Sequence, residues 1–379
     1  MKIAIARQKY TPFGGAERFV EHALAGLRAQ SVEVTVIARE WTGDAAGILQ
    51  CNPFYLGRTW RDVGFAHGVQ QIIAAGRFDL VQSHERIPGC HVFRAGDGVH
   101  ATWLELRDQA RGGIARFLTG RSPWHTYTKD AEAAMFRHPD LRAVICNSNM
   151  VRDDIARRFG VAADKLHVVH NGVDLDYFHP GLRDEHRRRV RAELGIAADA
   201  PLILFVGSGF ERKGVPGLLR ALAAMERKDA QLVVVGKDRD QKLAEKIAQT
   251  LGVDARVRFL GGQQDVRPYY GAADMFCLPT LYDPMPNAAL EAFACGLPVV
   301  TSTTCGAAEL IEEGKNGFVC NALDAAALAR HMTMLADDGN RRLAAGMGEA
   351  ARRSVEHLDL TTMAQAITDL YRRLLGLQP

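Results

Sequence analysis

Residues 274–302 contain a complete strand–turn–helix–strand unit. An apolar run (MFCLP) is followed by a polar turn (TLYDPMPN), a helix-forming stretch (AALEAFACG) and a second apolar run (PVVTS). Short apolar runs that flank a helix are typical of parallel strands that are buried on both faces. The stretch therefore predicts one strand–helix–strand crossover of an α/β sheet, with ligand-binding groups at the carboxyl edge of its strands.

The same alternation fills almost the whole chain and restarts at Pro201. The first block has the strand candidates KIAIAR, VEVTVIA, FDLVQS, HVFRA and RAVICNS, and the second has PLILFVG, QLVVVGK, RVRFLG, DMFCLP, PVVTS and GFVC. Two such blocks in 379 residues predict an α/β protein with two Rossmann-like lobes, parallel sheets and a cleft between the lobes. We expect a first domain at residues 1–180, a second at 181–360, and a helix in 361–379 that crosses back to the first.

Composition indicates a globular protein of the cytoplasm. The hydrophobic share is 47%, the charged share is 24% and the net charge is only +3, so nothing predicts a nucleic-acid partner. No apolar run approaches the roughly 18 residues of a membrane span, and the first residues carry charges too early for a signal peptide. The seven cysteines are dispersed without CxxC spacing, which predicts reduced thiols rather than disulfides or a zinc site.

The polar turn and helix of residues 274–302 carry the first candidate site. Asp283 lies in the turn and Glu291 in the helix, and the backbone N–H groups of Asn287, Ala288 and Ala289 lie between them. Carboxylates can bind sugar hydroxyls, and the amides at the start of a helix can bind a phosphate. This order of groups fits a sugar nucleotide, which has hydroxyls at both ends and a diphosphate in the middle.

Two strand-to-helix turns provide further candidates for diphosphate binding. Arg212 and Lys213 follow a strand in FVGSGFERKGV, where a helix start disfavours cations unless an anion is bound. Gly14 and Gly15 follow the first strand in TPFGGAER and would allow the backbone to approach a phosphate. The alternatives are solvated charges and a structural turn, and the absence of GxGxxG argues against a dinucleotide site.

Polar residues at other strand ends are candidates for sugar contacts. His84 and Glu85 follow a strand in SHERIPG, and Asp97 follows the next one in FRAGDG. Such residues often line the site of an α/β protein, although they can also cap turns. Glu17, close to the paired glycines, is a further candidate for contact with the donor sugar or the acceptor.

Residues 101–129 form a basic segment that is rich in apolar side chains. It contains five Arg or Lys residues and only two acids. Its large apolar residues are Trp103, Leu104, Leu106, Phe117, Leu118 and Trp124. Such a segment can rest on an anionic membrane surface. The alternative is a helix whose apolar face packs on its own domain, and GlyGly at 112 and 113 interrupts any continuous amphipathic face.

Together these motifs resemble the retaining GT-B glycosyltransferases of family 4. The resemblance rests on FGGAER, VGSGFERKG, AADMFCLPTLYDPMPNAALEAFACGLPVV, CGAAELI and GKNGFV, and it extends from about residue 2 to 378. KYTPFGGAER and GSGFERKGV are most similar to the branch of lipopolysaccharide core glucosyltransferase I.

The resemblance implies roles for the donor-side residues. Glu291 would bind the ribose hydroxyls and Asp283 the sugar hydroxyls, although the family usually has the longer Glu at the latter position. Lys213 would bind the diphosphate. Ser208 stands where the family usually has an arginine, so Arg212 would supply that charge.

The resemblance also implies the substrates and the setting. Gly14 and Gly15 would form the diphosphate loop, and Asp97 would lie near the donor sugar and the acceptor. The implied reaction moves glucose from UDP-glucose, without a metal ion or other cofactor, to a lipid-linked oligosaccharide acceptor, a heptose of the lipopolysaccharide inner core. The implied location is the cytoplasm, peripheral on the inner face of the membrane.

Three other functions remain open on the sequence. A family 4 enzyme could act on another polysaccharide or lipid acceptor. The chain could bind a nucleotide sugar without catalysis, although it keeps the acids and cations that such a protein would lose. It could also bind NAD, with Glu40 after the second strand as the ribose-binding acid.

Overall fold

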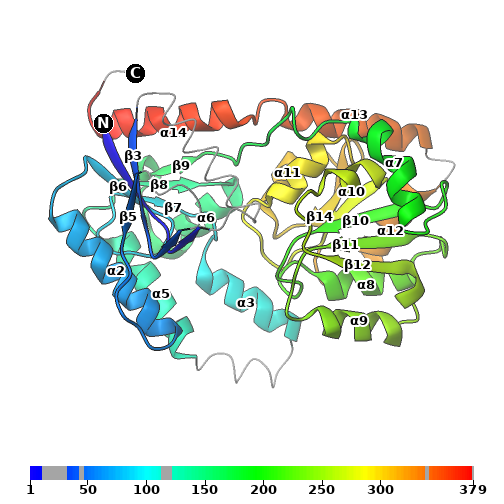
Figure 1. Ribbon diagram of the computed structural model, residues 1–379, viewed down its shortest axis with the longest axis horizontal. Coiled ribbons are helices and arrows are strands. Elements are labelled where there is room, and N and C mark those ends of the chain that lie inside the picture. The colour runs from blue at the N-terminus through cyan, green and yellow to red at the C-terminus, as the bar shows by residue number, and fades with distance from the viewer. Residues whose placement is uncertain (11–31, 42–46, 112–121, 338–340, 378–379) are drawn as a thin grey trace. The chain divides into compact units, whose positions relative to one another are not determined.

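The computed structural model divides into two compact units (Figure 1). It describes residues 1–10, 32–41, 47–111, 122–337 and 341–377, with the backbone alone at Tyr10 and 341–345. The first unit comprises Met1–Gly172 and Leu360–Pro379, and the second is Val173–Asp359. The first unit therefore ends at Gly172 rather than at residue 180, because the backbone N–H of Val173 already bonds to Leu358 O at 2.8 Å in the second unit.

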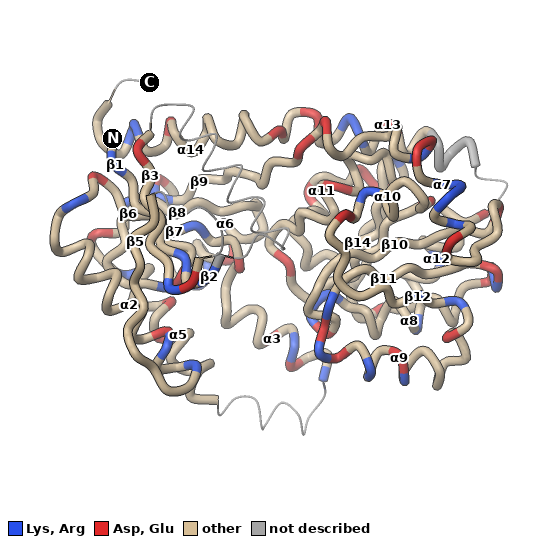
Figure 2. The backbone as a smooth tube through the Cα atoms, viewed as in Figure 1, with Lys and Arg blue, Asp and Glu red and all other residues tan. Residues whose placement is uncertain are grey.

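The first unit is built on a parallel sheet with the strand order β5-β3-β1-β6-β7-β8-β9. Its strands are β1 (Lys2–Ala6), β3 (Glu33–Ala38), β5 (Ile48–Gln50), β6 (Leu80–Ser83), β7 (Val92–Arg94), β8 (Ala143–Cys146) and β9 (Leu166–Val168), and β2 (Lys9–Tyr10) pairs separately with β4 (Glu40–Trp41). Its helices are α2 (Arg58–Ala74), α3 (His100–Arg111), α5 (Pro123–Arg137), α6 (Asn149–Phe159) and α14 (Leu360–Leu374). Most strand segments are tan in Figure 2, as expected for apolar strands that are covered on both faces.

The last helix, α14, packs on the sheet of the first unit, as expected. Its residues Met363, Ile367 and Leu370 are buried in one cluster with side chains of β1 and β3. The hydroxyl of Tyr371 donates to Gln82 Oε1 at 2.7 Å, so a buried hydrogen bond also attaches α14 to β6.

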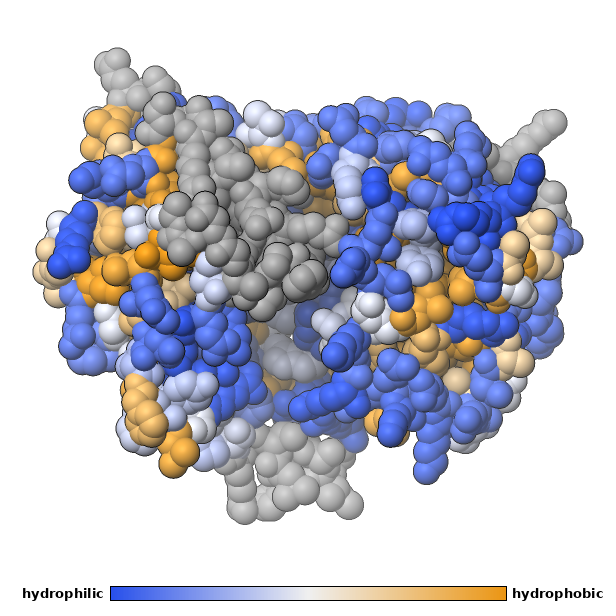
Figure 3. Space-filling view, viewed as in Figure 1, coloured by the Kyte–Doolittle hydropathy of each residue, from blue (hydrophilic) through white to orange (hydrophobic). Residues whose placement is uncertain are grey.

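Apolar side chains are exposed just before α2 and at its start. The exposed fractions are 79% for Phe54, 76% for Leu56 and 51% for Trp60, and the rings of Phe54 and Trp60 meet edge to face at 5.8 Å. Figure 3 shows orange side chains over this end of α2, at the lower left.

Among the described helices, none combines the length and apolarity that a membrane crossing requires.

The second unit has a parallel sheet with the strand order β12-β11-β10-β13-β14-β15. The strands are β10 (Leu202–Val206), β11 (Gln231–Val235), β12 (Val257–Gly261), β13 (Met275–Leu278), β14 (Val299–Ser302) and β15 (Gly317–Cys320). The helices are α7 (Leu182–Glu193), α8 (Val215–Ala224), α9 (Gln241–Thr250), α10 (Arg267–Ala272), α11 (Asn287–Ala294), α12 (Ala325–Ala336) and α13 (Arg341–Val355). The two Rossmann-like domains and the crossover at residues 274–302 are thus confirmed.

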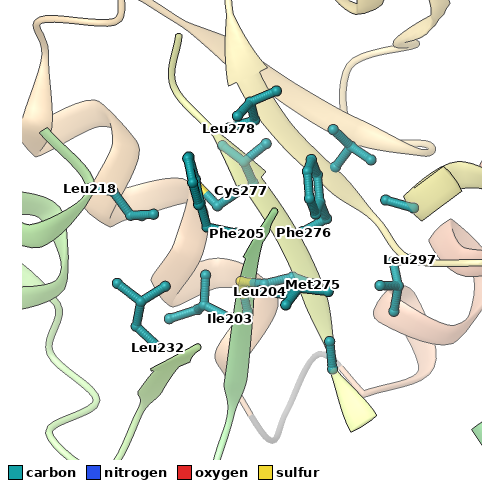
Figure 4. Close-up of a cluster of buried hydrophobic side chains, with 14 of the residues drawn as sticks. Ile203, Leu204, Phe205, Leu218, Leu232, Met275, Phe276, Cys277, Leu278 and Leu297 are labelled. Atoms are coloured by element: carbon teal, nitrogen blue, oxygen red, sulfur yellow. The ribbon is translucent and has the colours of Figure 1, made fainter. Parts of the chain in front are cut away.

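The core of the second unit lies around its two central strands. Figure 4 shows Leu204 and Phe205 of β10 beside Met275 and Phe276 of β13, and all four side chains are at most 1% exposed. Because both strands are apolar on both faces, helices must cover both sides of the sheet. The polar groups of this unit therefore gather at the strand ends.

One acid anchors α7 to the sheet. Asp274, directly before β13, pairs with Arg187 Nη1 at 2.8 Å and Arg183 Nη2 at 3.2 Å, and it also accepts from Arg191. It further accepts from the backbone N–H of Leu202 at 2.9 Å, which attaches the start of β10 to the same carboxylate.

Candidate active site

The turn after β10 presents Arg212 and Lys213. Gly207, with φ +153°, has no Cβ, and an added Cβ would lie 2.7 Å from Lys213 Cδ, so glycine leaves room for the lysine side chain. Gly214, with φ +82°, ends the turn, and an added Cβ there would lie 1.9 Å from Pro279 O. The two glycines therefore fix the course of the turn and the position of the lysine.

Asp238 holds the first half of this turn, a role that the sequence analysis did not predict. Its Oδ2 accepts from the backbone N–H groups of Gly209 and Phe210, the latter at 3.0 Å. Asp238 follows β11, the strand next to β10, so parallel pairing brings the two strand ends together. An acid at a neighbouring strand end was the only available signal.

The polar turn before α11 is hydrogen-bonded to the turn after β10 that carries Arg212 and Lys213. Arg212 O accepts from the backbone N–H of Leu281 at 2.7 Å and from Thr280 Oγ1 at 2.9 Å. In return, Arg212 Nη1 donates to Tyr282 O at 2.9 Å. These bonds bring Asp283, the next residue, beside the cation pair.

Asp283 pairs with both cations through one oxygen. Its Oδ2 lies 3.2 Å from Lys213 Nζ and 3.3 Å from Arg212 Nη1, and among the described residues no donor reaches this buried oxygen with good hydrogen-bond geometry. Burial raises the pKa of Asp283, but the charges of Lys213 and Arg212 outweigh it, so the pKa lies below its ordinary value. Two cations around one carboxylate leave a net positive charge, and the oxygen can still accept from a hydroxyl.

Glu291 lies on α11 with a different partner. It is the fifth residue of the helix, about one turn from its start, and its Oε2 accepts from Tyr270 Oη at 2.8 Å. The amide of Ala289 donates to Pro286 O at 3.0 Å, so the expectation that this N–H is free is wrong. The tight first turn of α11 explains the difference. Tyr270, buried on α10, was not foreseen as the residue that holds Glu291.

In the first unit, polar residues meet at the ends of β1 and β6. His84 Nδ1 lies 3.5 Å from Arg7 Nη1, and burial, with the charges of Arg7 and Arg94, holds the pKa of His84 well below its ordinary value. Glu85 Oε1 accepts from the backbone N–H of Gln8 at 3.1 Å. The imidazole of His84 is therefore neutral, and its other ring nitrogen, Nε2, lies 3.0 Å from Gln82 Nε2.

The end of β7 brings Asp97 to the same edge. Asp97 is exposed, and its charge acts on both Glu85 and Arg86. Burial raises the pKa of Glu85, and Asp97 raises it further against the opposing effect of the Gln8 amide. The expected candidates Gly14, Gly15 and Glu17 lie outside the described residues.

Comparison with known proteins decides the family. The family Glycosyl transferases group 1 matches residues 186–354, and Glycosyltransferase Family 4 matches residues 13–177. A D-inositol 3-phosphate glycosyltransferase of Streptomyces scabiei is 30% identical over 395 residues, covering 94% of this chain and 86% of the relative. The chain is a family 4 glycosyltransferase.

Two further proteins resemble the transferase over most of its length. The lipopolysaccharide glucosyltransferase WaaG of Escherichia coli K12 is 29% identical over 325 residues, covering 84% of this chain and 85% of WaaG. A crystal structure of WaaG superposes with a TM-score of 0.82 at 25% identity, covering 97% of this chain and 99% of that one. Anabaena Alr3699/HepE, solved with UDP-glucose, shares the fold at 21% identity and a TM-score of 0.74, covering 98% and 100%.

The arrangement in the second unit of the transferase suits electrostatic catalysis. Arg212 and Lys213 provide fixed positive charge on a turn that glycines and Asp238 hold in place, so little reorganisation is needed as charge develops on a leaving group. In the part of the chain that the structure describes, no three His, Cys, Asp or Glu side chains gather as metal ligands.

Proposed function

We propose that the transferase moves glucose from UDP-glucose to a heptose of the lipopolysaccharide inner core, with retention of the anomeric configuration. The observation that carries the proposal is the shared ion pair of Arg212, Lys213 and Asp283. Similarity to WaaG, a lipopolysaccharide glucosyltransferase, and to HepE, solved with UDP-glucose, supports the substrates.

The diphosphate of the donor binds Arg212 and Lys213 in this proposal. The group carries two negative charges and the pair is only partly neutralised by Asp283, so attraction remains. Asp283 Oδ2 then accepts from a sugar hydroxyl, since no donor in the described part of the chain reaches this buried oxygen with good geometry. Glu291 binds the ribose hydroxyls, and the first amides of α11, at Asn287 and Ala288, face the phosphates.

The chemical step breaks the bond between the anomeric carbon and the diphosphate oxygen. The electron pair leaves with the diphosphate, whose growing charge Arg212 and Lys213 stabilise. The acceptor oxygen bonds to the anomeric carbon on the face that the diphosphate leaves, and its proton passes to a phosphate oxygen. This route needs neither a metal ion nor a nucleophile from the protein.

The acceptor binds the first unit in the proposal. His84 and Asp97 contact its sugar, while Gly14, Gly15 and Glu17 complete the donor side. The enzyme works in the cytoplasm at the inner membrane surface, where residues 101–129 meet anionic lipid. The exposed side chains of Phe54, Leu56 and Trp60 support this contact with lipid. They lie beside residues 101–129, because Arg58 of their segment stacks on Trp124 at 3.3 Å.

A second acceptor is favoured by one observation. A relative with 30% identity is a D-inositol 3-phosphate glycosyltransferase. Presenting UDP-glucose with either a heptose-terminated core or inositol 3-phosphate separates the two. Transfer to inositol 3-phosphate alone would replace the heptose assignment and keep the donor assignment.

Replacing Glu291 with glutamine tests the donor mode. We expect the KM for UDP-glucose to rise roughly 10- to 100-fold, because a charge-assisted hydrogen bond to the ribose becomes a neutral one. Glu349→Gln, on an exposed acid of α13 in the same unit, is the matched control and should leave KM unchanged. If Glu291→Gln behaves like the control, Glu291 does not bind the donor.

A further inference from the structure

A groove lies between β9 and α14 in the first unit (Figure 1). Its volume is about 600 Å³, and its walls come from residues 166–169 at β9 and from residues 366–377 of α14 and the turn that follows it. A space of this size holds a small ligand or a few residues of a peptide. No residue of the candidate active site lines this β9 groove, so the function proposed above gives it no role.

The backbone of β9 is open on the side that faces away from β8. The sheet order ends at β9, so β8 is its single neighbour among the described strands. The backbone N–H of Val169 donates to Cys146 O of β8 at 2.8 Å, and successive residues of a strand direct their N–H and C=O groups to opposite sides. The N–H and C=O of Val168 therefore point away from β8, and no described residue bonds to them. An open edge of this kind can pair with another strand.

Apolar side chains also line the β9 groove. Val169, directly after β9, packs in one cluster with Leu370 of α14. After α14, Gly376 adopts φ +67° and turns the chain, which leaves Leu377 49% exposed at the groove. An apolar side chain bound beside Leu377 would remove this surface from water.

The β9 groove carries positive charge that its acid cancels only in part. Arg372 and Arg373 both line it, and Asp369 is the single acid among the described lining residues. Asp369 Oδ1 lies 3.5 Å from Arg372 Nη1 and also accepts from Gln365 Nε2 at 2.9 Å. The guanidinium of Arg373 makes no ion pair or hydrogen bond with a described residue. A carboxylate in the groove would therefore find an uncommitted cation.

The charge of Arg373 acts close to the strand. Burial, followed by the charge of Arg373, lowers the pKa of His167 on β9, and Asp164 opposes the effect. The imidazole of His167 is therefore neutral at pH 7 and leaves the positive charge of Arg373 undiminished. A chain that bonds to the open side of β9 can thus reach the guanidinium with a side chain.

We propose that the β9 groove binds an extended acidic segment of a partner protein, which joins the sheet as a strand beside β9. The backbone of this segment bonds to Val168, an acidic side chain pairs with Arg373, and an apolar side chain covers Leu377. Segments that join a sheet edge gain affinity from main-chain hydrogen bonds and specificity from side-chain contacts. The first unit thus has a docking site for another protein that is separate from the transfer chemistry.

Fluorescence anisotropy with the full-length chain tests the site. The probe is a short fluorescein-labelled peptide in which glutamate and valine alternate, and we expect it to bind saturably. The same peptide with lysine in place of glutamate should not bind, because Arg373 repels it, and a form with N-methylated backbone amides should not bind, because it cannot pair with β9. Hydrogen exchange in the same samples should show that the acidic peptide slows exchange of the Val168 amide.

Variants locate the peptide on the β9 groove. Arg373→Gln should weaken its binding about tenfold, the effect of one charge-assisted hydrogen bond. Val168→Pro removes the outward N–H and should weaken binding about 2- to 10-fold, and an edge strand tolerates proline where the N–H bonds to no other strand. Arg239→Gln, which removes a cation of the second unit whose side chain is 89% exposed, is the control and should have no effect. Circular dichroism checks the fold of each variant, and Arg373→Gln decides alone if Val168→Pro is unfolded.

Three results would overturn the proposal. Equal binding of the acidic and the lysine peptide, or no binding of either, would exclude an acidic partner. Binding of the acidic peptide that Arg373→Gln leaves unchanged would place the peptide elsewhere on the chain. A dimer in sedimentation experiments that Val168→Pro dissociates would assign the open side of β9 to a second copy of this chain. None of these readouts uses glucose transfer, so they do not depend on the proposed function.

Discussion

Replacing Lys213 with methionine is expected to lower the rate of glucose transfer about 100- to 1000-fold. The lysine holds a fixed positive charge 3.2 Å from Asp283, and a preorganised group of this kind stabilises the charge on the leaving diphosphate. Its side chain crosses the backbone at Gly207, so methionine can occupy the same path without the charge. The measurement is kcat with saturating UDP-glucose and a heptose-terminated acceptor.

Lys242→Met provides the matched control. Lys242 is exposed on α9 of the same unit, so its loss changes net charge equally and should leave kcat unchanged. Removing Lys213 also leaves Asp283 with Arg212 alone, so thermal unfolding of both variants must accompany the kinetics. A folded Lys213→Met enzyme with unchanged kcat would remove the cation pair from the mechanism.

Replacing Asp274 with alanine is expected to lower the free energy of unfolding of the second unit by about 3 to 5 kcal/mol. The change leaves Arg191, which is 2% exposed, without its acid, and it removes the acceptor for the amide of Leu202. Denaturant unfolding measures the effect. Asp265→Ala breaks a pair that is similar in length, 2.8 Å to Arg267, but far more exposed, so it should cost less than about 1 kcal/mol.

Asp274 should also make the stability of the second unit depend on pH in the acid range. Burial raises the pKa of Asp274, but the charges of Arg191 and Arg187 outweigh it, so the folded-state pKa lies below the ordinary value. Its contribution to stability is therefore complete above the ordinary carboxylate pKa and is lost as pH falls through the folded-state pKa. If Asp274→Ala unfolds at the same denaturant concentration as Asp265→Ala, the anchor adds nothing beyond a surface pair.

Most of the strands in each domain could be predicted from short-range sequence signals. Runs such as PLILFVG and DMFCLP are too short for helices and too apolar for surface strands, so buried parallel strands were the remaining solution. β5 and β9 escaped prediction because each has three residues and no buried apolar run. The end of the first unit was misplaced because Val173 is fixed by Leu358, a partner that is remote in the sequence.

The candidate site shows the same limit of prediction. Arg212, Lys213 and Asp283 were selected separately from their motifs, and the structure brings them together through hydrogen bonds to the backbone of the two turns. Asp238 and Tyr270, which hold the Lys213 turn and Glu291, were not predicted. Each acts across more than 20 residues through strand or helix packing, and no local pattern records such a contact.

Calorimetric titration of the unmodified chain with UDP-glucose, in the presence of a metal chelator, tests the central claim most directly. We expect saturable binding of one UDP-glucose per chain that weakens as salt rises, because Arg212 and Lys213 attract the diphosphate by charge. NAD should give no heat. Binding of NAD, with no response to UDP-glucose or any other nucleoside diphosphate sugar, would contradict the account.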